Sequence, residues 1–167
     1  MLLFAHLGLT LAAARCAKKG DLAFIALGSM LPDIIDKPLG LIAFGTPNMG
    51  RTFGHTLLFF LILAALALLI KKIWLYSLAG GVFAHLVLDF MWNSPVILFW
   101  PILGGFPQAA YMDTLSYLQM LILGLKDPMI SLPELFGLAY VIRLYWEIRR
   151  LSVIKYMNRA KTFLHIF

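Results

Sequence analysis

Residues 54–92 read GHTLLFFLILAALALLIKKIWLYSLAGGVFAHLVLDFMW, two apolar runs separated only by Lys71 and Lys72. The first run, 54–70, has 17 residues, and the second, 73–92, has 20. A helix that crosses a bilayer needs about 20 predominantly apolar residues, with a range of roughly 17–25. Each run therefore predicts a membrane-spanning helix, and the two are expected to cross in opposite directions.

The composition of the whole chain agrees with this interpretation. Of its 167 residues, 62% are apolar and 13% are charged, whereas a soluble domain is roughly 45–50% apolar and about 25% charged. These proportions exclude a soluble enzyme, a disordered tail and a nucleic-acid-binding domain, and they predict an integral membrane protein of the all-α class. The single cysteine, Cys16, excludes an intramolecular disulfide and a cysteine-based zinc site.

Further helical segments flank the central pair on both sides. They are 2–14, 22–31 (ended by Pro32), 111–125 as an amphipathic helix, and 130–146, which begins near Pro133. Proline ends or kinks a helix because it lacks a backbone N–H. We therefore predict a polytopic helical membrane protein with about five membrane-embedded helices, one amphipathic helix and a basic C-terminal tail.

The basic residues predict how the chain is oriented, because loops rich in Lys and Arg stay in the cytoplasm. Alternating spans bring three basic clusters to one side. The clusters are Arg15-Lys18-Lys19, Lys71-Lys72 and Arg149-Arg150-Lys155-Arg159-Lys161. We expect a multi-pass protein of the cytoplasmic (inner) membrane with its N-terminus outside and its C-terminus inside. Residues 1–148 would form one membrane-embedded domain, and 149–167 a basic cytoplasmic tail.

Six ionisable residues lie within or beside the apolar segments, where a charge costs roughly 2.5–3.5 kcal/mol at a helix centre. They are His6, Asp33, Asp36, His55, His85 and Asp89. The predicted topology brings all six toward the outer membrane face, although it was assigned from Lys and Arg alone. This convergence makes the six residues the candidates for a functional site.

The residue types in this group favour a divalent metal. His85 and Asp89 are spaced i, i+4, so both side chains lie on one helix face and can contact one ion. Asp33 and Asp36 add two carboxylates directly after Pro32. Mixed nitrogen and oxygen ligands suit zinc, manganese or iron better than calcium or magnesium. Such a metal activates water, so no nucleophilic Ser or Cys is needed.

Each of these residues also has a plain structural interpretation. A single histidine in such a segment is more often a satisfied core or interfacial residue than a ligand. Asp33 suits a turn after Pro32, and Asp89 could pair with Arg51. Taken together, the six residues favour a metal site, with a proton or ion pathway and a structural polar cluster as the alternatives.

The motifs around these residues, over about 1–107, resemble those of one family in order and spacing. They are His6, Gly28-Ser29-Met30-Leu31-Pro32-Asp33-Ile34-Ile35-Asp36, Arg51-Thr52-Phe53-Gly54-His55-Thr56-Leu57-Leu58, Gly81-Val82-Phe83-Ala84-His85-Leu86-Val87-Leu88-Asp89 and Trp100-Pro101. The family is that of the membrane-bound metal-dependent hydrolases, also described as LexA-binding and inner-membrane-associated. The His-x-x-x-Asp spacing is also similar to that of zinc-dependent phospholipases C, which cleave phosphodiesters.

The resemblance implies a helical membrane hydrolase with five metal ligands. These are His6, Asp33, His55, His85 and Asp89. The sequence departs from the family pattern at two positions, since Lys37 and Gly50 stand where family members often have histidine.

The sequence thus predicts a metal-dependent hydrolase that acts on a phosphoester or lipid-like substrate at the outer membrane face. Asp36 is the candidate general base or water-orienting residue, and Arg51, with Lys37, is the candidate for binding an anionic group such as phosphate. Zinc is the favoured metal, with manganese or iron as alternatives, and membrane lipid rather than nucleic acid is the expected partner. A proton- or ion-coupled transporter and a non-catalytic membrane interaction protein are the alternative functions.

Overall fold

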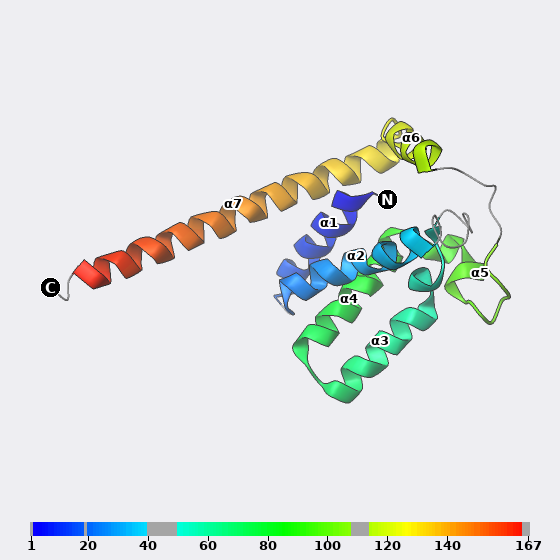
Figure 1. The fold of residues 1–167 in the computed structure, drawn as a ribbon, viewed down its shortest axis with the longest axis horizontal. Coiled ribbons are helices and arrows are strands. Elements are labelled where there is room, and N and C mark those ends of the chain that lie inside the picture. The colour runs from blue at the N-terminus through cyan, green and yellow to red at the C-terminus, as the bar shows by residue number, and fades with distance from the viewer. Residues whose placement is uncertain (1, 19, 40–49, 108–113, 165–167) are drawn as a thin grey trace.

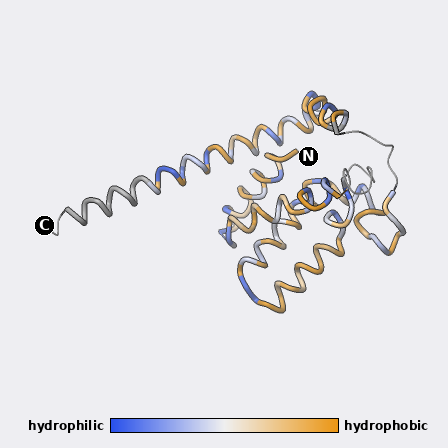
Figure 2. Tube along the Cα trace, viewed as in Figure 1, coloured by the Kyte–Doolittle hydropathy of each residue, from blue (hydrophilic) through white to orange (hydrophobic). Residues whose placement is uncertain are grey.

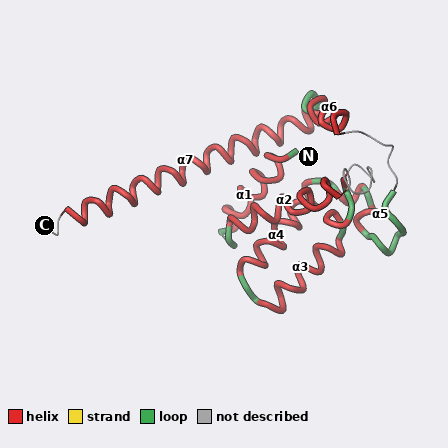
Figure 3. Tube along the Cα trace, viewed as in Figure 1, coloured by secondary structure: helices red, strands yellow, loops and turns green. Residues whose placement is uncertain are grey.

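The computed structural model describes residues 2–18, 20–39, 50–107 and 114–164. Over these residues the chain is all-α, with seven α-helices and no strand, which confirms the predicted class (Figure 3). The α-helices are α1 (Leu3–Ala17), α2 (Leu22–Pro38), α3 (Leu57–Ile70), α4 (Ile73–Leu88), α5 (Pro95–Leu98), α6 (Thr114–Gly124) and α7 (Pro128–Leu164). Two short 3-10 helices, η3 (Phe53–His55) and η4 (Met91–Asn93), precede α3 and follow α4.

Helices α2 and α4 form the centre of the fold, and glycines let their backbones touch. A Cβ atom at Gly28 would meet the carbonyl oxygen of Leu78, and one at Gly81 would lie 2.7 Å from the backbone nitrogen of Ser29. Glycine permits this approach because it has no Cβ. α1 packs on α2, and α3 packs along α4 (Figure 1). The carboxyl ends of α2 and α4 therefore meet η3 at one end of the bundle.

Helix α7 lies along α1 and extends beyond it (Figure 1). Gly8 and Gly137 make the close approach, since a Cβ on either one would overlap the backbone of the other helix. The Glu134 carboxylate accepts hydrogen bonds from the backbone N–H groups of Phe4, at 2.7 Å, and Ala5, at 2.9 Å. The N-cap residue of α1, Leu2, makes no side-chain hydrogen bond to the helix. A side chain from α7 caps the first turn of α1 instead.

This cap leads to a first prediction. Glu134→Gln removes the negative charge at the positive end of α1 and weakens the hydrogen bonds to Phe4 and Ala5. We expect the free energy of unfolding to fall by about 1 kcal/mol, measured by denaturant titration in detergent with circular dichroism.

The control for this prediction is Glu147→Gln, which breaks the other α1–α7 carboxylate contact. Glu147 accepts two hydrogen bonds from Arg15, at 2.7 and 2.8 Å, and these hold the pKa of Glu147 below its ordinary value. Both side chains are 38% exposed, and exposed ion pairs contribute little to stability. The control should therefore change the unfolding free energy less than Glu134→Gln, and the reverse order would contradict the assignment of Glu134 as a cap.

The prediction that Pro32 ends the second helix is wrong. α2 continues through Pro32 to Pro38, so the missing N–H of one proline does not break it. The extension is held by a tertiary contact, because Asp36 accepts hydrogen bonds from the 52–55 segment. Within the helix, Lys37 also pairs with Asp33 one turn earlier, at 2.7 Å. Packing thus overrides the local preference of proline.

Other helix boundaries also differ from the sequence prediction. α3 begins at Leu57 because the Thr56 hydroxyl caps the backbone N–H of Phe59, which leaves 54–55 in η3. α4 ends at Leu88, before η4, rather than at residue 92. α6 accounts for the expected amphipathic helix over 114–124, while 111–113 lie outside the described residues.

The last helix is longer than expected at both ends. α7 begins at Pro128, after Asp127 accepts a hydrogen bond from the backbone N–H of Met129, and Pro133 lies inside it rather than at its start. It also runs without a break past residue 149, so the expected tail continues the same helix to Leu164.

The surface of the bundle is strongly apolar. Figure 2 shows α3 as hydrophobic along its length, and Leu68 and Leu69 on this helix are 64% and 77% exposed. Within the described part of the chain, no helix combines the length and the apolar character needed to cross a membrane.

Candidate metal centre

The six ionisable residues singled out in the sequence meet at the end of the bundle where α2, η3 and α4 come together. They are His6 of α1, Asp33 and Asp36 of α2, His55 of η3, His85 of α4 and Asp89 at the α4 C-cap. The three histidines and Asp36 are at most 1% exposed. Two sets of three residues each bring their ligand atoms within 4.8 Å of one another. The sets are His6-His85-Asp89 and Asp33-His55-His85. We call the five residues of these sets the ligand cluster.

The proton on His85 is fixed by a backbone contact. Its Nδ1 lies 2.7 Å from the carbonyl oxygen of Ser29, which can only accept a hydrogen bond. Nδ1 must therefore carry the proton, and Nε2 of the neutral ring presents a lone pair. The close approach of α2 and α4 at Gly81 brings the Ser29 carbonyl to this position.

Asp36 fixes the proton on His55 in the same way. One carboxylate oxygen lies 2.7 Å from His55 Nδ1, and the carboxylate also accepts backbone N–H bonds from Thr52, Gly54 and His55 at 2.7–3.1 Å. Both oxygens of the carboxylate accept hydrogen bonds from backbone N–H groups, and these bonds stabilise its ionised form. Asp36 is therefore ionised, His55 Nδ1 holds a proton, and His55 Nε2 also presents a lone pair.

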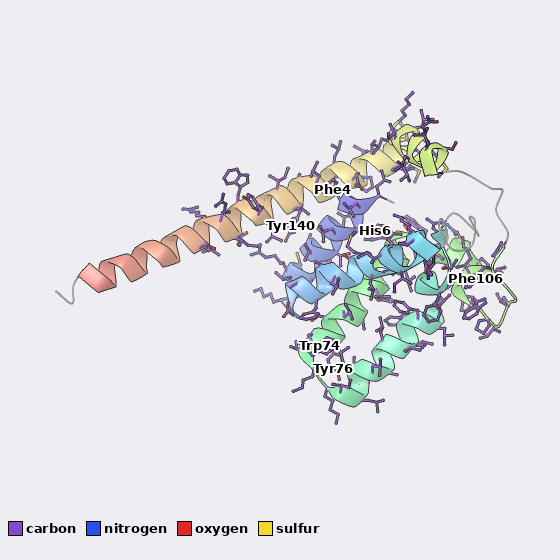
Figure 4. The ribbon with its side chains drawn as sticks, in the orientation of Figure 1. Phe4, His6, Trp74, Tyr76, Phe106 and Tyr140 are labelled. Carbon is purple, nitrogen blue, oxygen red and sulfur yellow. The ribbon has the colours of Figure 1, made fainter. Side chains whose placement is uncertain are left out.

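The two Nε2 atoms of His55 and His85 face each other at 3.1 Å. Two lone pairs at this distance repel unless a positive charge, a proton or a metal ion, lies with them. The His6 ring stacks on His85 with centroids 4.1 Å apart (Figure 4 labels His6 on α1). Its buried Nδ1 makes no hydrogen bond within the described residues, while its Nε2 faces a carboxylate oxygen of Asp89 at 3.1 Å. This donor set fits a divalent metal such as zinc.

The two acids of the ligand cluster each face an imidazole and a basic side chain. Asp89 Oδ1 lies 3.1 Å from His6 Nε2, while Asp89 Oδ2 lies 2.9 Å from the Arg51 guanidinium and 3.7 Å from His55 Nε2. Asp33 Oδ1 lies 3.7 Å from His55 Nε2, and its Oδ2 pairs with Lys37. Arg51 and Lys37 are 38% and 36% exposed, so they form the rim of the cluster.

Sequence reasoning missed the backbone groups that orient the histidines. The Ser29 carbonyl and the N–H groups of Thr52 and Gly54 act through the main chain, so their side-chain types carry no signal. The one available signal was the pair of glycines, Gly28 and Gly81, at the α2–α4 contact. Trp100, matched as part of the family pattern, packs edge-on against Phe53 of η3.

Comparisons with known proteins agree with the motifs. The family model described as YdjM inner membrane protein matches residues 1–159, nearly the whole chain. Comparisons with curated proteins and with solved structures each gave no match. The family resemblance expected from the sequence is thereby confirmed, and it is that of the LexA-binding, membrane-bound metal-dependent hydrolases. The chain belongs to the YdjM inner membrane protein family.

Proposed function

We propose that this protein is a membrane-embedded hydrolase that depends on a divalent metal ion. The observation that carries the proposal is that the buried Nε2 atoms of His55 and His85 lie 3.1 Å apart and both present a lone pair. Asp36 and the Ser29 carbonyl fix this arrangement, because each binds the Nδ1 atom of one of the two rings. Such an arrangement is costly without a cation. Family membership supports the same function.

The ligand cluster would hold the ion. Its members are His6, Asp33, His55, His85 and Asp89. The two sets share His85, whose Nδ1 is already bonded to Ser29, so both sets depend on the same Nε2 atom and describe one site. We therefore propose one ion for each chain, with zinc favoured and manganese or iron as alternatives. When bound, such an ion polarises a phosphoryl or carbonyl oxygen and activates water.

The remaining polar residues have distinct roles in this proposal. Asp36 positions His55, because the acceptor atoms of its carboxylate face the His55 ring and three backbone donors. A general-base role for Asp36 stays a prediction. Arg51 and Lys37, at the rim, bind the anionic group of the substrate and stabilise charge that develops on it.

The location of the site suggests the substrate. The exposed apolar surface of α3 supports embedding in the membrane, and the basic clusters support an outside N-terminus and an inside C-terminus. In this topology residues 1–148 form the embedded domain, and the basic residues from 149 onward lie on the cytoplasmic side. The ligand cluster then opens toward the outer face, where it acts on a phosphoester or lipid-like molecule rather than on nucleic acid.

Two measurements on the detergent-purified protein test this proposal. Elemental analysis gives the metal content, and an assay with phosphatidic acid and a chromogenic phosphodiester measures hydrolysis. We expect about one equivalent of zinc, manganese or iron, and hydrolysis that a chelator abolishes and added metal restores. Absence of metal binding at saturating zinc would contradict the metal site. Stoichiometric metal without hydrolysis of either substrate would favour a non-catalytic role.

A further inference from the structure

A second candidate site lies away from the ligand cluster, between the carboxyl half of α1 and the amino half of α4. A cavity of about 460 Å³ opens there, and Gly20 and Ile25 are among the residues that line it. Its walls are small side chains of the two helices, among them Ala14 and Ala17 on α1 and Ala84 on α4. The volume falls in the range of roughly 300–1,000 Å³ that small-molecule sites occupy.

Two residues indicate that this cavity accepts a ligand. A Cβ atom built on Gly80, which lines it, would meet no atom within 4 Å, so the space beside α4 is not filled by the protein. Thr10 also lines the cavity and is 4% exposed, yet its buried hydroxyl makes no hydrogen bond within the described residues. A buried hydroxyl normally has a partner, so the protein leaves one polar group in this wall unsatisfied.

One end of the cavity is strongly basic. Lys18 directly follows Ala17 as the C-cap of α1, and Lys72, preceded by Lys71, is the N-cap of α4. All three lysines are exposed, and within the described residues none of them makes an ion pair. Trp74 and Tyr76 lie at this end of α4, where it adjoins α3 (Figure 4).

We propose that this cavity binds an anionic phospholipid, with one acyl chain in the apolar groove and the phosphate at the three lysines. The shape and the charge together select this occupant: the groove takes an apolar chain, and the basic mouth takes a negative headgroup. A neutral lipid leaves the lysines without a counter-charge, and an acidic peptide leaves the groove unfilled. In the proposed topology this mouth faces the cytoplasmic leaflet, which carries anionic lipids. The site is separate from the ligand cluster and does not depend on hydrolase activity.

Lipid titration of the full-length protein in detergent, followed by native mass spectrometry, tests the proposal. The probes are phosphatidylglycerol, phosphatidylcholine with the same acyl chains, and soluble glycerol phosphate. We expect phosphatidylglycerol to bind roughly 125-fold more tightly than phosphatidylcholine, from roughly fivefold for each of the three lysines, and glycerol phosphate to bind far more weakly than either lipid. K71Q/K72Q leaves Lys18 in place and should reduce the preference for phosphatidylglycerol over phosphatidylcholine to roughly fivefold.

A pair of glycine variants tests the groove itself. Gly80→Leu fills the cavity and should weaken the binding of both lipids at least tenfold. Gly105→Leu is the control, because an added Cβ there also meets no atom within 4 Å, and it should leave both affinities unchanged. Unchanged circular dichroism and metal content show that each variant is folded. Equal affinity for the two lipids in the wild type, or an unaltered affinity in Gly80→Leu, would overturn the proposal.

Discussion

His85→Ala is expected to abolish metal binding by the purified protein, from about one equivalent to none. Both sets of the ligand cluster need the Nε2 atom of His85, so its loss leaves two donors in each set. Inductively coupled plasma mass spectrometry after equilibration with zinc measures the stoichiometry. Because the substitution also leaves the Ser29 carbonyl without its ring partner, His6→Ala provides a second variant. It leaves the backbone contacts of His55 and His85 in place and removes only the contact of His6 with Asp89, and it should lower the metal affinity as well.

Two further variants separate ligands from positioning residues. Asp36→Asn keeps every member of the ligand cluster but weakens the orientation of His55, so the affinity should fall about 10–100-fold while the stoichiometry recovers at excess metal. His165→Ala, which changes the fourth histidine of the chain, should bind zinc like the wild type; this residue lies outside the described part of the structure. A full equivalent of tightly bound zinc in His85→Ala would refute the ligand assignment.

The second large effect is expected at the contact between α2 and α4. Gly81→Ala adds one carbon, which would lie 2.7 Å from Ser29 N and 2.8 Å from the Gly28 Cα. Both neighbours are backbone atoms, so the two helices must separate. We expect a loss of roughly 1–3 kcal/mol or more in the free energy of unfolding, and a weaker metal affinity because the Ser29 carbonyl moves away from His85. Thermal unfolding in detergent, followed by circular dichroism, measures the first effect.

Gly80→Ala is the matched control, since it adds the same carbon one residue earlier in the same helix. No atom lies within 4 Å of that position, so the steric cost is absent. Alanine favours a helix by about 1 kcal/mol over glycine, and the control should therefore unfold at the wild-type temperature or above it. Equal stability of the two variants would show that the close packing at Gly81 does not hold α2 against α4.

Several features of the fold follow from the sequence because they depend on composition and on local charge. The long apolar runs predict α3 and α4, and the break at Lys71-Lys72 is where one helix ends and the next begins. The candidate site residues could be selected because a histidine or an aspartate in an apolar segment needs a partner. The structure brings all six of them together.

The parts that could not be predicted depend on contacts between distant backbone groups. Pro32 remains inside α2 because the extension beyond it is anchored by Asp36, and no local pattern reports that anchor. Likewise, His55 lies in η3 rather than in α3, because Thr56 caps the helix behind it. Hydrogen bonds to main-chain atoms are compatible with almost any side chain, so the tautomers of His55 and His85 became apparent only from the geometry.

The cap that Glu134 provides for α1 has a consequence for how the protein is made. Phe4 and Ala5 leave the ribosome before the carboxylate that binds their N–H groups, which follows 129 residues after Ala5. At about 5–20 residues per second, this delay is roughly 6 to 26 s. During that interval the first turn of α1, which carries His6, has no side-chain cap. We therefore expect His6 to be the last ligand residue to reach its final position in the nascent protein.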